Sequence, residues 1–125
     1  MARVVLVVED ADPVAALEIA LSAIEGIAVT RVPNGRAALE VIRSNEIELA
    51  AVITDLNLPF VDGFEVIKAV REQDRYAGVP IFVVSGDSRP DTPQLVSELG
   101  ATVFFSKPYS PVVIRDSLEE LLHVK

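Results

Sequence analysis

Five short apolar runs recur along the chain, and a stretch with helical spacing of apolar residues follows each of them. The runs are residues 3–8, 27–32, 49–53, 79–84 and 102–105. Continuous, β-branched runs of this length are typical of strands buried on both faces of a parallel sheet. The second run mixes polar with apolar residues, which suits a strand at the edge of a sheet. The alternation predicts an α/β fold in which a parallel sheet carries helices on both faces.

Turn and capping signals place the helices between these strands. Helix starts are predicted at Asp12-Pro13, Asn34-Gly35, Asp62-Gly63, Thr92-Pro93 and Ser110-Pro111. Glu65 is expected to reach back to Asp62 in a capping box, and Gly26 and Gly100 are expected to terminate helices. The expected buried stripes are Val14, Leu17, Leu21 and Ile24 in the first helix and Ile114, Leu118, Leu121 and Leu122 in the last. Residues 73–78 are predicted to form a polar loop.

Composition narrows the class of protein. With 125 residues, half of them hydrophobic, the chain has the size of one domain with one good core. It has no cysteine, which excludes a disulfide scaffold and thiolate sites and favours the cytoplasm as its location. No apolar run is long enough for a signal peptide or a membrane span. The net charge of −8 argues against direct binding to nucleic acid, which needs a basic face.

Residues with reactive or charged side chains stand where the apolar runs end. Glu9-Asp10, Asp55, Ser85 and Lys107 each follow a strand, so they gather at one edge of a parallel sheet. With strand order 2-1-3-4-5, the strands that carry Asp10 and Asp55 are neighbours about 4.8 Å apart, so their carboxylates can share one ion. Converging carboxylates repel one another unless a cation offsets them, and oxygen-only ligands suit Mg²⁺. Lys107, on a long flexible stem, adds a second positive charge, so the set predicts a site for a phosphoryl group that arrives with the metal.

The same residues, in this order, resemble the receiver domain of two-component response regulators. Nearly the whole chain takes part, through Glu9-Asp10, Asp55 followed by Pro59 and Gly63, Ser85-Gly86, and Lys107-Pro108. The resemblance implies a flavodoxin-like, doubly wound five-stranded parallel sheet in the order 2-1-3-4-5. Residues 1–125 are expected to form a single receiver domain with no output domain after Lys125, either as a stand-alone regulator or as a receiver excised from a larger protein.

The resemblance assigns metal and acceptor roles to four residues. Asp55 is the expected phospho-acceptor, a carboxylate nucleophile that forms an acyl phosphate. Asp10, Asp55 and the backbone carbonyl of Asn57 are expected to hold Mg²⁺, and Glu9 to act on the metal partly through water. The chain is therefore expected to be a magnesium-dependent phosphoprotein of a phosphorelay.

The resemblance also implies how the phosphoryl group is bound and read. Ser85 and Lys107 are expected to bind phosphoryl oxygens. Phe104, three residues before Lys107, occupies the position of a switch aromatic, without the hydroxyl of the tyrosine that is common there. The expected output surface is formed by the fourth helix, the fifth strand and the fifth helix.

The expected partners follow from the same resemblance. The phosphoryl group would come from a phosphohistidine of a sensor histidine kinase or a histidine phosphotransfer protein. A downstream protein or a second copy of the chain would read the output surface. The chain would not be an enzyme toward other substrates, since it would catalyse only its own phosphorylation and dephosphorylation.

Simpler explanations stand beside these assignments. Asp55 terminates a strand, as aspartate often does, Lys107 sits beside a turn proline, and Phe104 is suited to a core position. His123, the one histidine, lies near the end of the last predicted helix, where it favours the helix dipole. Alanines of the first helix act as filler or form an apolar docking surface. For the whole chain, the alternatives are a binding-only adaptor of the same fold with vestigial phosphorylation and, more distantly, a flavin-binding module.

Overall fold

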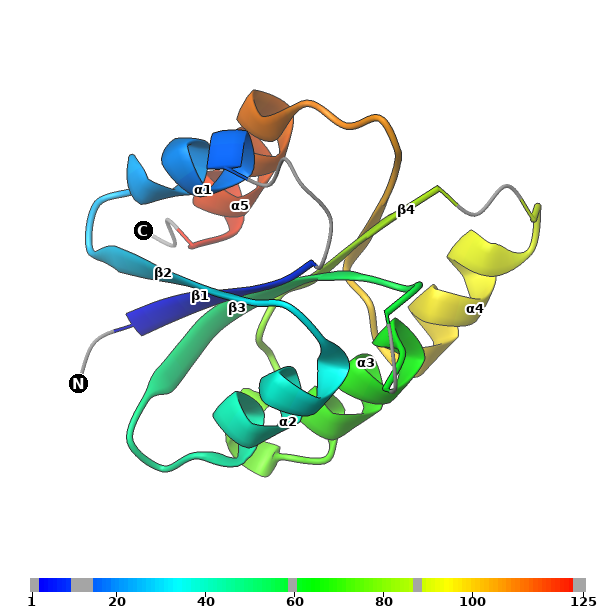
Figure 1. The fold of residues 1–125 in the computed structure, drawn as a ribbon, viewed down its shortest axis with the longest axis horizontal. Helices are drawn as coiled ribbons and strands as arrows, with labels where there is room; N and C mark the ends of the chain where they lie inside the picture. The colour runs from blue at the N-terminus through cyan, green and yellow to red at the C-terminus, as the bar shows by residue number, and fades with distance from the viewer. Residues whose placement is uncertain (1–2, 10–14, 59–60, 87–88, 123–125) are drawn as a thin grey trace.

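The computed structural model describes residues 3–9, 15–58, 61–86 and 89–122. Strands and helices alternate along these ranges and form three layers with the sheet in the middle (Figure 1). In chain order they are β1 (Arg3–Val8), α1 (Ala15–Ser22), β2 (Ile27–Val32), α2 (Gly35–Arg43), β3 (Glu48–Asp55), α3 (Gly63–Arg71), the 3₁₀ turn η1 (Asp74–Tyr76), β4 (Ile81–Ser85), α4 (Thr92–Leu99), β5 (Val103–Ser106) and α5 (Pro111–Leu122). No helix in the described part of the chain is long and apolar enough to cross a membrane.

The five strands form one parallel sheet in the order β2-β1-β3-β4-β5, which confirms the predicted fold class and strand order. From β1 the chain runs to β2 on one side and then returns to β3 on the other side. The direction of strand addition therefore reverses between β1 and β3. In sheets of this kind, the carboxyl ends of the strands at such a reversal form the crevice where ligands bind.

Alternate residues of the strands fill two core layers, one on each face of the sheet. Leu6 and Val8 of β1 belong to the layer that packs against α2, α3 and α4. Val5 and Val7 belong to the layer that packs against α1 and α5. Figure 1 shows the same division, with α1 and α5 on one side of the sheet and α2, α3 and α4 on the other. Both faces are covered, as the continuous apolar runs predict.

Capping residues begin three helices where the sequence predicts. The side chain of Asn34 accepts a hydrogen bond from the backbone N–H of Ala37 at 2.8 Å, and that of Asp62 accepts one from the backbone N–H of Glu65 at 3.1 Å. The hydroxyl oxygen of Ser110 accepts one from the backbone N–H of Val113 at 3.3 Å, where α5 begins. The predicted helix start at Asp12-Pro13 lies outside the described residues.

The predicted cap at Thr92 is wrong by one residue. The N-cap of α4 is Asp91, whose side chain makes no capping hydrogen bond, while Thr92 is already helical and fully buried. Burial of the Thr92 side chain therefore outweighs its preference for the N-cap position.

Residues 73–78 are not simply a polar loop, which corrects the prediction. They contain η1, and Tyr76 at its end is only 2% exposed. The Tyr76 ring packs in the core layer of α2, α3 and α4. Its hydroxyl accepts a hydrogen bond from the N–H of Leu49 at 3.3 Å and donates one to the carbonyl of Ile47 at 3.4 Å. A single aromatic residue in a polar stretch thus anchors the segment to the start of β3.

The predicted helix stripes are confirmed in their centres and fail at one end. Leu17, Leu21 and Ile24 are buried although α1 ends at Ser22, and Val14 lies outside the described residues. In α5, Ile114 and Leu118 are fully buried, whereas Leu121 is 41% exposed. Leu121 lines an open hollow beside the amino ends of the strands, whereas Leu122 is partly buried against the core layer of α1 and α5. The predicted stripe therefore fails at Leu121 alone among its described members.

Candidate functional site

Four of the predicted site residues stand at the carboxyl edge of the sheet. Glu9 directly follows β1, Asp55 is the last residue of β3, Ser85 is the last residue of β4, and Lys107 directly follows β5. Glu9 and Asp55 are each 5% exposed and Ser85 is fully buried. The parallel arrangement therefore brings together residues that are up to 98 positions apart in the sequence, from Glu9 to Lys107.

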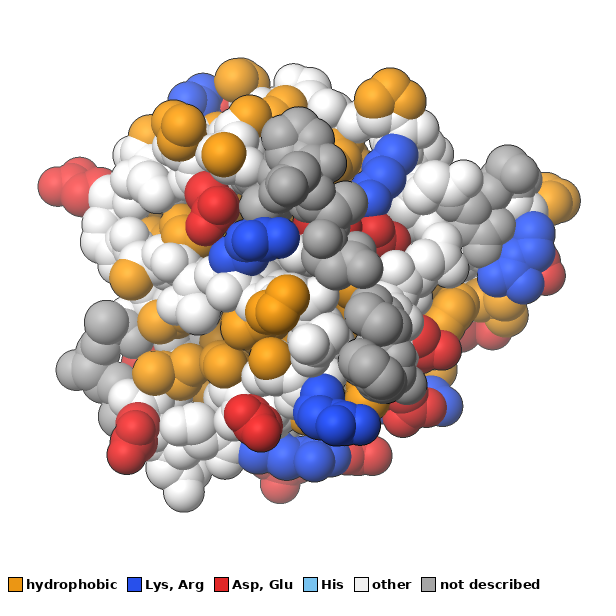
Figure 2. All heavy atoms as spheres, in the orientation of Figure 1, with side chains coloured by type: hydrophobic (Ala, Val, Ile, Leu, Met, Phe, Trp, Pro, Cys, Tyr) orange, Lys and Arg blue, Asp and Glu red, His pale blue; other side chains and the backbone are white. Residues whose placement is uncertain are grey.

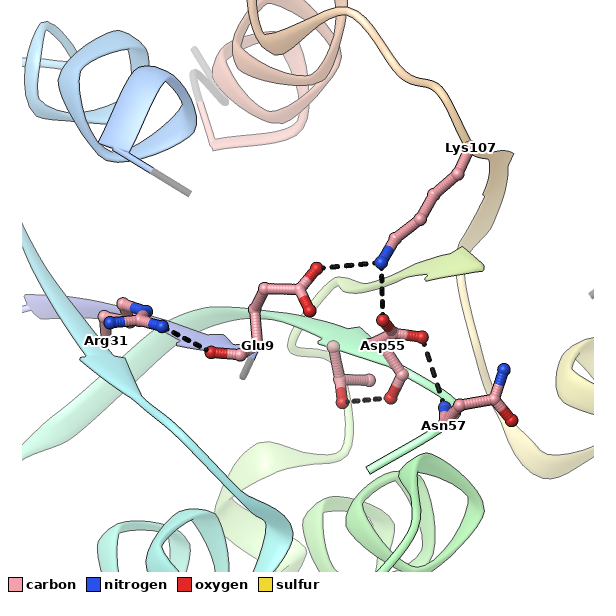
Figure 3. Close-up of polar contacts among 6 residues, drawn as sticks. Glu9, Arg31, Asp55, Asn57 and Lys107 are labelled. Carbon is pink, nitrogen blue, oxygen red and sulfur yellow. Dashed lines mark hydrogen bonds and ion pairs between the residues drawn. The ribbon is translucent and has the colours of Figure 1, made fainter. Parts of the chain in front are cut away.

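Lys107 makes ion pairs with both carboxylates, as Figure 3 shows. Its Nζ lies 2.6 Å from Asp55 Oδ2 and 3.0 Å from Glu9 Oε2. Because β4 separates β5 from β3, the lysine stem extends across one strand to reach Asp55. The prediction that Lys107 can cover this gap is confirmed.

The charge of Lys107 is stabilised by these contacts. Burial alone would lower the pKa of Lys107, but the hydrogen bonds to Asp55 and Glu9 and the negative charges of both residues raise it above its ordinary value of 10.5. The side chain therefore carries a full positive charge at neutral pH. An ammonium that is shared between two carboxylates can also exchange one of them for another anion, since its three donors rotate about a flexible stem.

The backbone around Asp55 is held on several sides. Asp55 Oδ1 accepts a hydrogen bond from the N–H of Asn57 at 3.2 Å. The carbonyl oxygen of Asp55 accepts one from the buried Thr54 hydroxyl at 2.8 Å. Gly63 packs against the same carbonyl, so closely that a Cβ at this position would lie 2.2 Å from the oxygen. Glycine is therefore required where α3 begins, and the carboxylate of Asp55 is presented from a rigid turn.

The donor set fits a hard divalent cation. The carboxylates of Glu9 and Asp55 are both buried and contact the same ammonium, so negatively charged oxygen atoms lie close together at this site. Carboxylate oxygens are the ligands that Mg²⁺ prefers. Asp10, a predicted metal ligand, lies outside the described residues. Within the described ranges no group of three acidic, histidine or cysteine side chains converges. The predicted metal role of the Asn57 carbonyl stays a prediction.

Ser85 and Phe104 lie on adjacent strands. The carbonyl of Ser85 accepts a hydrogen bond from the N–H of Lys107 at 2.9 Å, which ties the end of β4 to the residue after β5. Phe104 pairs in register with Val83 and packs, partly buried, against the core layer of α2, α3 and α4. The core role of Phe104 is thus confirmed, and its role as a switch stays a prediction.

Two residues at the site are absent from the prediction made on the sequence. Arg31 in β2 donates a hydrogen bond from Nη2 to the carbonyl oxygen of Glu9 at 3.0 Å (Figure 3). Tyr109 lies close enough to the acidic pocket that burial first, and then the charge of Glu9, raises its pKa, while the charge of Lys107 acts against this. In the sequence, Arg31 could have been recognised as a site residue only because it is charged and lies next to the end of a strand. Tyr109 could have been recognised only because it lies two residues after Lys107.

This arrangement of fold and site defines a known class of protein, the receiver domains of response regulators. The response regulator receiver domain family matches residues 5–119, and the chain belongs to this family.

Individual relatives agree with that membership. The chain is 32% identical to sporulation initiation phosphotransferase F of Bacillus subtilis over 101 residues, which cover 81% of this chain and 78% of the relative. The crystal structure of a putative response regulator from Chloroflexus aurantiacus superposes with a TM-score of 0.83 at 29% identity, covering 99% of this chain and 100% of that one. The receiver domain of a sensor histidine kinase from Pseudomonas aeruginosa, solved with magnesium coordinated in its active-site cleft, has a TM-score of 0.80, covers 99% of this chain and 100% of that one, and at 22% identity shows the fold alone.

Proposed function

We propose that Asp55 accepts a phosphoryl group from a phosphohistidine of a sensor histidine kinase or a histidine phosphotransfer protein, in a reaction that requires Mg²⁺. The contact of the Lys107 ammonium with both Asp55 and Glu9 carries this proposal. A buried carboxylate at a strand end, held beside a cation that can exchange its anionic partner, is suited to attack phosphorus and to form an acyl phosphate. The family to which the chain belongs acts in two-component systems, where receiver domains take phosphate from kinases.

The transfer step assigns a task to each residue. One carboxylate oxygen of Asp55 forms a bond to phosphorus as the bond from phosphorus to the histidine nitrogen breaks, and the electron pair leaves with the imidazole. Lys107 exchanges its contact with Asp55 for a phosphoryl oxygen and so neutralises charge that moves away from the carboxylate. The hydroxyl of Ser85 donates to a second phosphoryl oxygen, and Gly86 leaves space beside it.

Divalent metal completes the site. Glu9, Asp10, Asp55 and the carbonyl of Asn57 would hold Mg²⁺, with Glu9 acting partly through water. When bound, the cation offsets the repulsion among the carboxylates and the incoming phosphoryl oxygens. The magnesium ion in the cleft of the Pseudomonas aeruginosa receiver domain supports the same choice of metal here.

The phosphorylated state is read at the surface of α4, β5 and α5. When the Ser85 hydroxyl turns to the phosphoryl group it vacates volume, and Phe104 on the neighbouring strand moves inward to fill that volume, because close-packed interiors do not keep such gaps. Leu95 in α4 and Val112 and Val113 in α5 are exposed apolar side chains on these elements. Figure 2 shows hydrophobic side chains at the surface over α1 and α5. A downstream protein or a second copy of the chain binds to the surface of α4, β5 and α5.

Phosphorylation in the presence of Mg²⁺ and a small phosphodonor, measured by intact mass, tests the function. The wild-type protein should gain one phosphoryl group, and should gain none in excess chelator. Asp55→Asn should not be labelled, whereas Asp62→Asn, which changes an exposed carboxylate that caps α3, should be labelled normally. Normal labelling of Asp55→Asn would overturn the assignment. A wild-type protein that binds a partner but is never labelled would instead favour the binding-only adaptor.

A variant of Phe104 separates the switch from simple packing. Phe104→Ala should leave the labelling of Asp55 intact but uncouple it from partner binding or self-association. If Phe104 only packs in the core, the truncation should cost about 3–5 kcal/mol of stability and affect both states alike. NMR spectra of β5 with and without beryllofluoride, a phosphoryl mimic, should show shifts around Phe104, and their absence would leave only the packing role.

A further inference from the structure

Arg31 makes a contact with the site from the side opposite to Lys107. In Figure 3, Arg31 and Lys107 lie on opposite sides of Glu9. Arg31 pairs in register with Val7, two residues before Glu9, so its long side chain runs along the end of β1. Its Nη2 reaches the backbone carbonyl of Glu9 at 3.0 Å. Lys107 binds the Glu9 carboxylate, and Arg31 binds the Glu9 main chain.

The main chain of Glu9 is therefore tied to β2 through both of its polar groups. Its N–H donates to the carbonyl of Val32 at 3.1 Å, and its carbonyl accepts from Arg31. A hydrogen bond from a charged donor is stronger than one from a neutral donor. With both of these groups held, the backbone of Glu9 is fixed, and so is the direction in which its side chain leaves the main chain.

One nitrogen of the Arg31 guanidinium has no hydrogen bond within the described part of the chain. This is Nε, which is buried. A buried donor without a partner is destabilising, and such groups are often tolerated where the side chain has a functional task. Among the described residues, Arg31 makes its hydrogen bond to the Glu9 carbonyl.

We propose that Arg31 is a positioning residue of the phosphoryl-transfer site, which holds the Glu9 carbonyl and thereby orients the Glu9 carboxylate toward the divalent cation. This inference rests on the proposed function, because it assigns Arg31 a role in the metal binding that phosphorylation of Asp55 requires. It extends the site to β2, the one strand that supplies none of the residues named in that function.

A positioning role and a purely electrostatic role predict opposite changes in Mg²⁺ affinity. If Arg31 acted only through its charge, then removal of a positive charge beside the site would strengthen the binding of Mg²⁺. If Arg31 positions Glu9, then its removal weakens the binding of Mg²⁺. Loss of an outer hydrogen-bond partner typically weakens metal affinity by about 10-fold or more.

The test uses Arg31→Gln and Arg31→Lys with the wild-type protein, and Arg43→Gln as a control that removes the same charge from an exposed position in α2. Mg²⁺ affinity is measured by calorimetric titration, and the rate of Asp55 labelling by a small phosphodonor is measured at saturating Mg²⁺. Thermal unfolding without metal is recorded for each protein, so that affinity can be compared with stability. Arg31→Met, which fills the same path with an apolar chain, replaces Arg31→Gln if the latter does not fold.

We expect about a 10-fold loss of Mg²⁺ affinity in Arg31→Gln, recovery to within about 3-fold in Arg31→Lys, and no change in Arg43→Gln. The labelling rate at saturating Mg²⁺ should change less than the affinity. Unchanged or tighter Mg²⁺ binding in Arg31→Gln, with normal labelling of the wild type, would overturn the role of Arg31 and leave the proposed function intact. A wild-type protein that neither binds Mg²⁺ nor is labelled would overturn both.

Discussion

Two cationic side chains connect distant parts of the chain, and they differ in what they bind. Arg71, at the end of α3, donates to the carbonyls of Tyr76 and Val79 at 2.8 Å each, and to that of Gly100 at 2.8 and 3.1 Å. Lys107 instead lies between the carboxylates of Asp55 and Glu9. The first cation is bound to neutral main-chain groups and the second to charged side chains.

The difference separates a structural contact from an exchangeable one. The planar guanidinium of Arg71 donates to backbone carbonyls whose positions are fixed by the fold, so these hydrogen bonds are not exchanged for others. Lys107 is a point charge on a flexible stem, and any anion that enters the pocket can compete for it.

The two ends of α4 also differ in how firmly they are held. Gly100, at the C-terminal end, has a φ of 114°, and its carbonyl accepts hydrogen bonds from Arg71, whereas Asp91 at the N-terminal end makes no side-chain capping bond.

The largest effect is expected when the structural contact is removed. Arg71→Met should lower the free energy of unfolding by about 3 kcal/mol, roughly 1 kcal/mol for each carbonyl that loses its donor. Urea unfolding measures this change. Arg115→Met, which removes an arginine paired with Asp116 on the exposed side of α5, should change stability by no more than about 0.5 kcal/mol. Equal unfolding midpoints for the two variants would show that Arg71 is not a structural contact.

Removal of the exchangeable cation should have a smaller effect that metal reverses. Without metal, Lys107→Met should lose about 1–3 kcal/mol, because the buried carboxylates of Glu9 and Asp55 each lose their contact with the ammonium. Millimolar Mg²⁺ should restore most of this loss by binding only the folded state. The same Mg²⁺ should not restore the stability lost in Arg71→Met. If Mg²⁺ raises the urea midpoints of both variants by the same amount, the distinction between the two contacts fails.

High pH should act on the Lys107 contact and not on the Arg71 contact. The pKa of Lys107 is raised above 10.5, so its contribution is complete below that value and is lost as the pH rises through the pKa of the folded protein. The raised pKa of Tyr109 acts in the same direction, since the folded protein keeps a proton that the unfolded chain releases above pH 10.0. Burial lowers the pKa of Arg71 from its ordinary value, yet a guanidinium is not deprotonated in proteins, so Arg71 stays charged over this range.

The urea midpoint of the wild type should therefore fall as the pH rises from about 9 to above 10.5, and it should fall less in Lys107→Met. Lys68→Met, which removes an exposed lysine of α3, serves as the matched control and should follow the wild type. An equal fall in Lys107→Met and Lys68→Met would exclude Lys107 as the source of the alkaline loss.

The smallest expected effect concerns the N-terminal end of α4 and has the opposite sign. The buried hydroxyl of Thr92 has no hydrogen-bond partner among the described residues, so Thr92→Val should raise stability by about 0.5–1 kcal/mol. Thr102→Val is the matched control, because the Thr102 hydroxyl oxygen accepts a hydrogen bond from the N–H of Ile81 at 3.0 Å. That variant should be destabilised by a similar amount. Loss of stability in both variants would indicate that the Thr92 hydroxyl has a hydrogen-bond partner in solution.

Most of the site could be predicted from the sequence because each of its residues follows an apolar run. The end of such a run marks the end of a buried strand, and parallel strands end at one edge. Asp55, Ser85 and Lys107 required no knowledge of contacts for their placement. The contact of Lys107 with two carboxylates could be found only from distances, since a lysine beside a turn proline is equally well explained as a surface residue.

The errors arose where burial competes with local propensity. Thr92 has the side chain of a capping residue, but it is buried in the core, and Asp91 occupies the N-cap position. Tyr76 lies in a polar segment, yet a ring and a hydroxyl that reach the start of β3 make that segment part of the core. Leu121 has the spacing of a buried helix position, but spacing alone does not show which of these positions the rest of the fold covers.

The sequence by itself determined the parallel α/β architecture, the edge at which the site forms and the residue types that stand there, because hydrophobic period and strand ends are local properties of a chain. Tertiary structure alone decided which groups share a partner. The Arg31 contact with the Glu9 carbonyl depends on the register of β1 against β2 and on the reach of one side chain. The four hydrogen bonds of Arg71 depend on two connections, one after α3 and one after α4, that both reach its guanidinium. Such contacts join residues that are distant in the sequence, and no local pattern records the geometry that brings them within 3 Å.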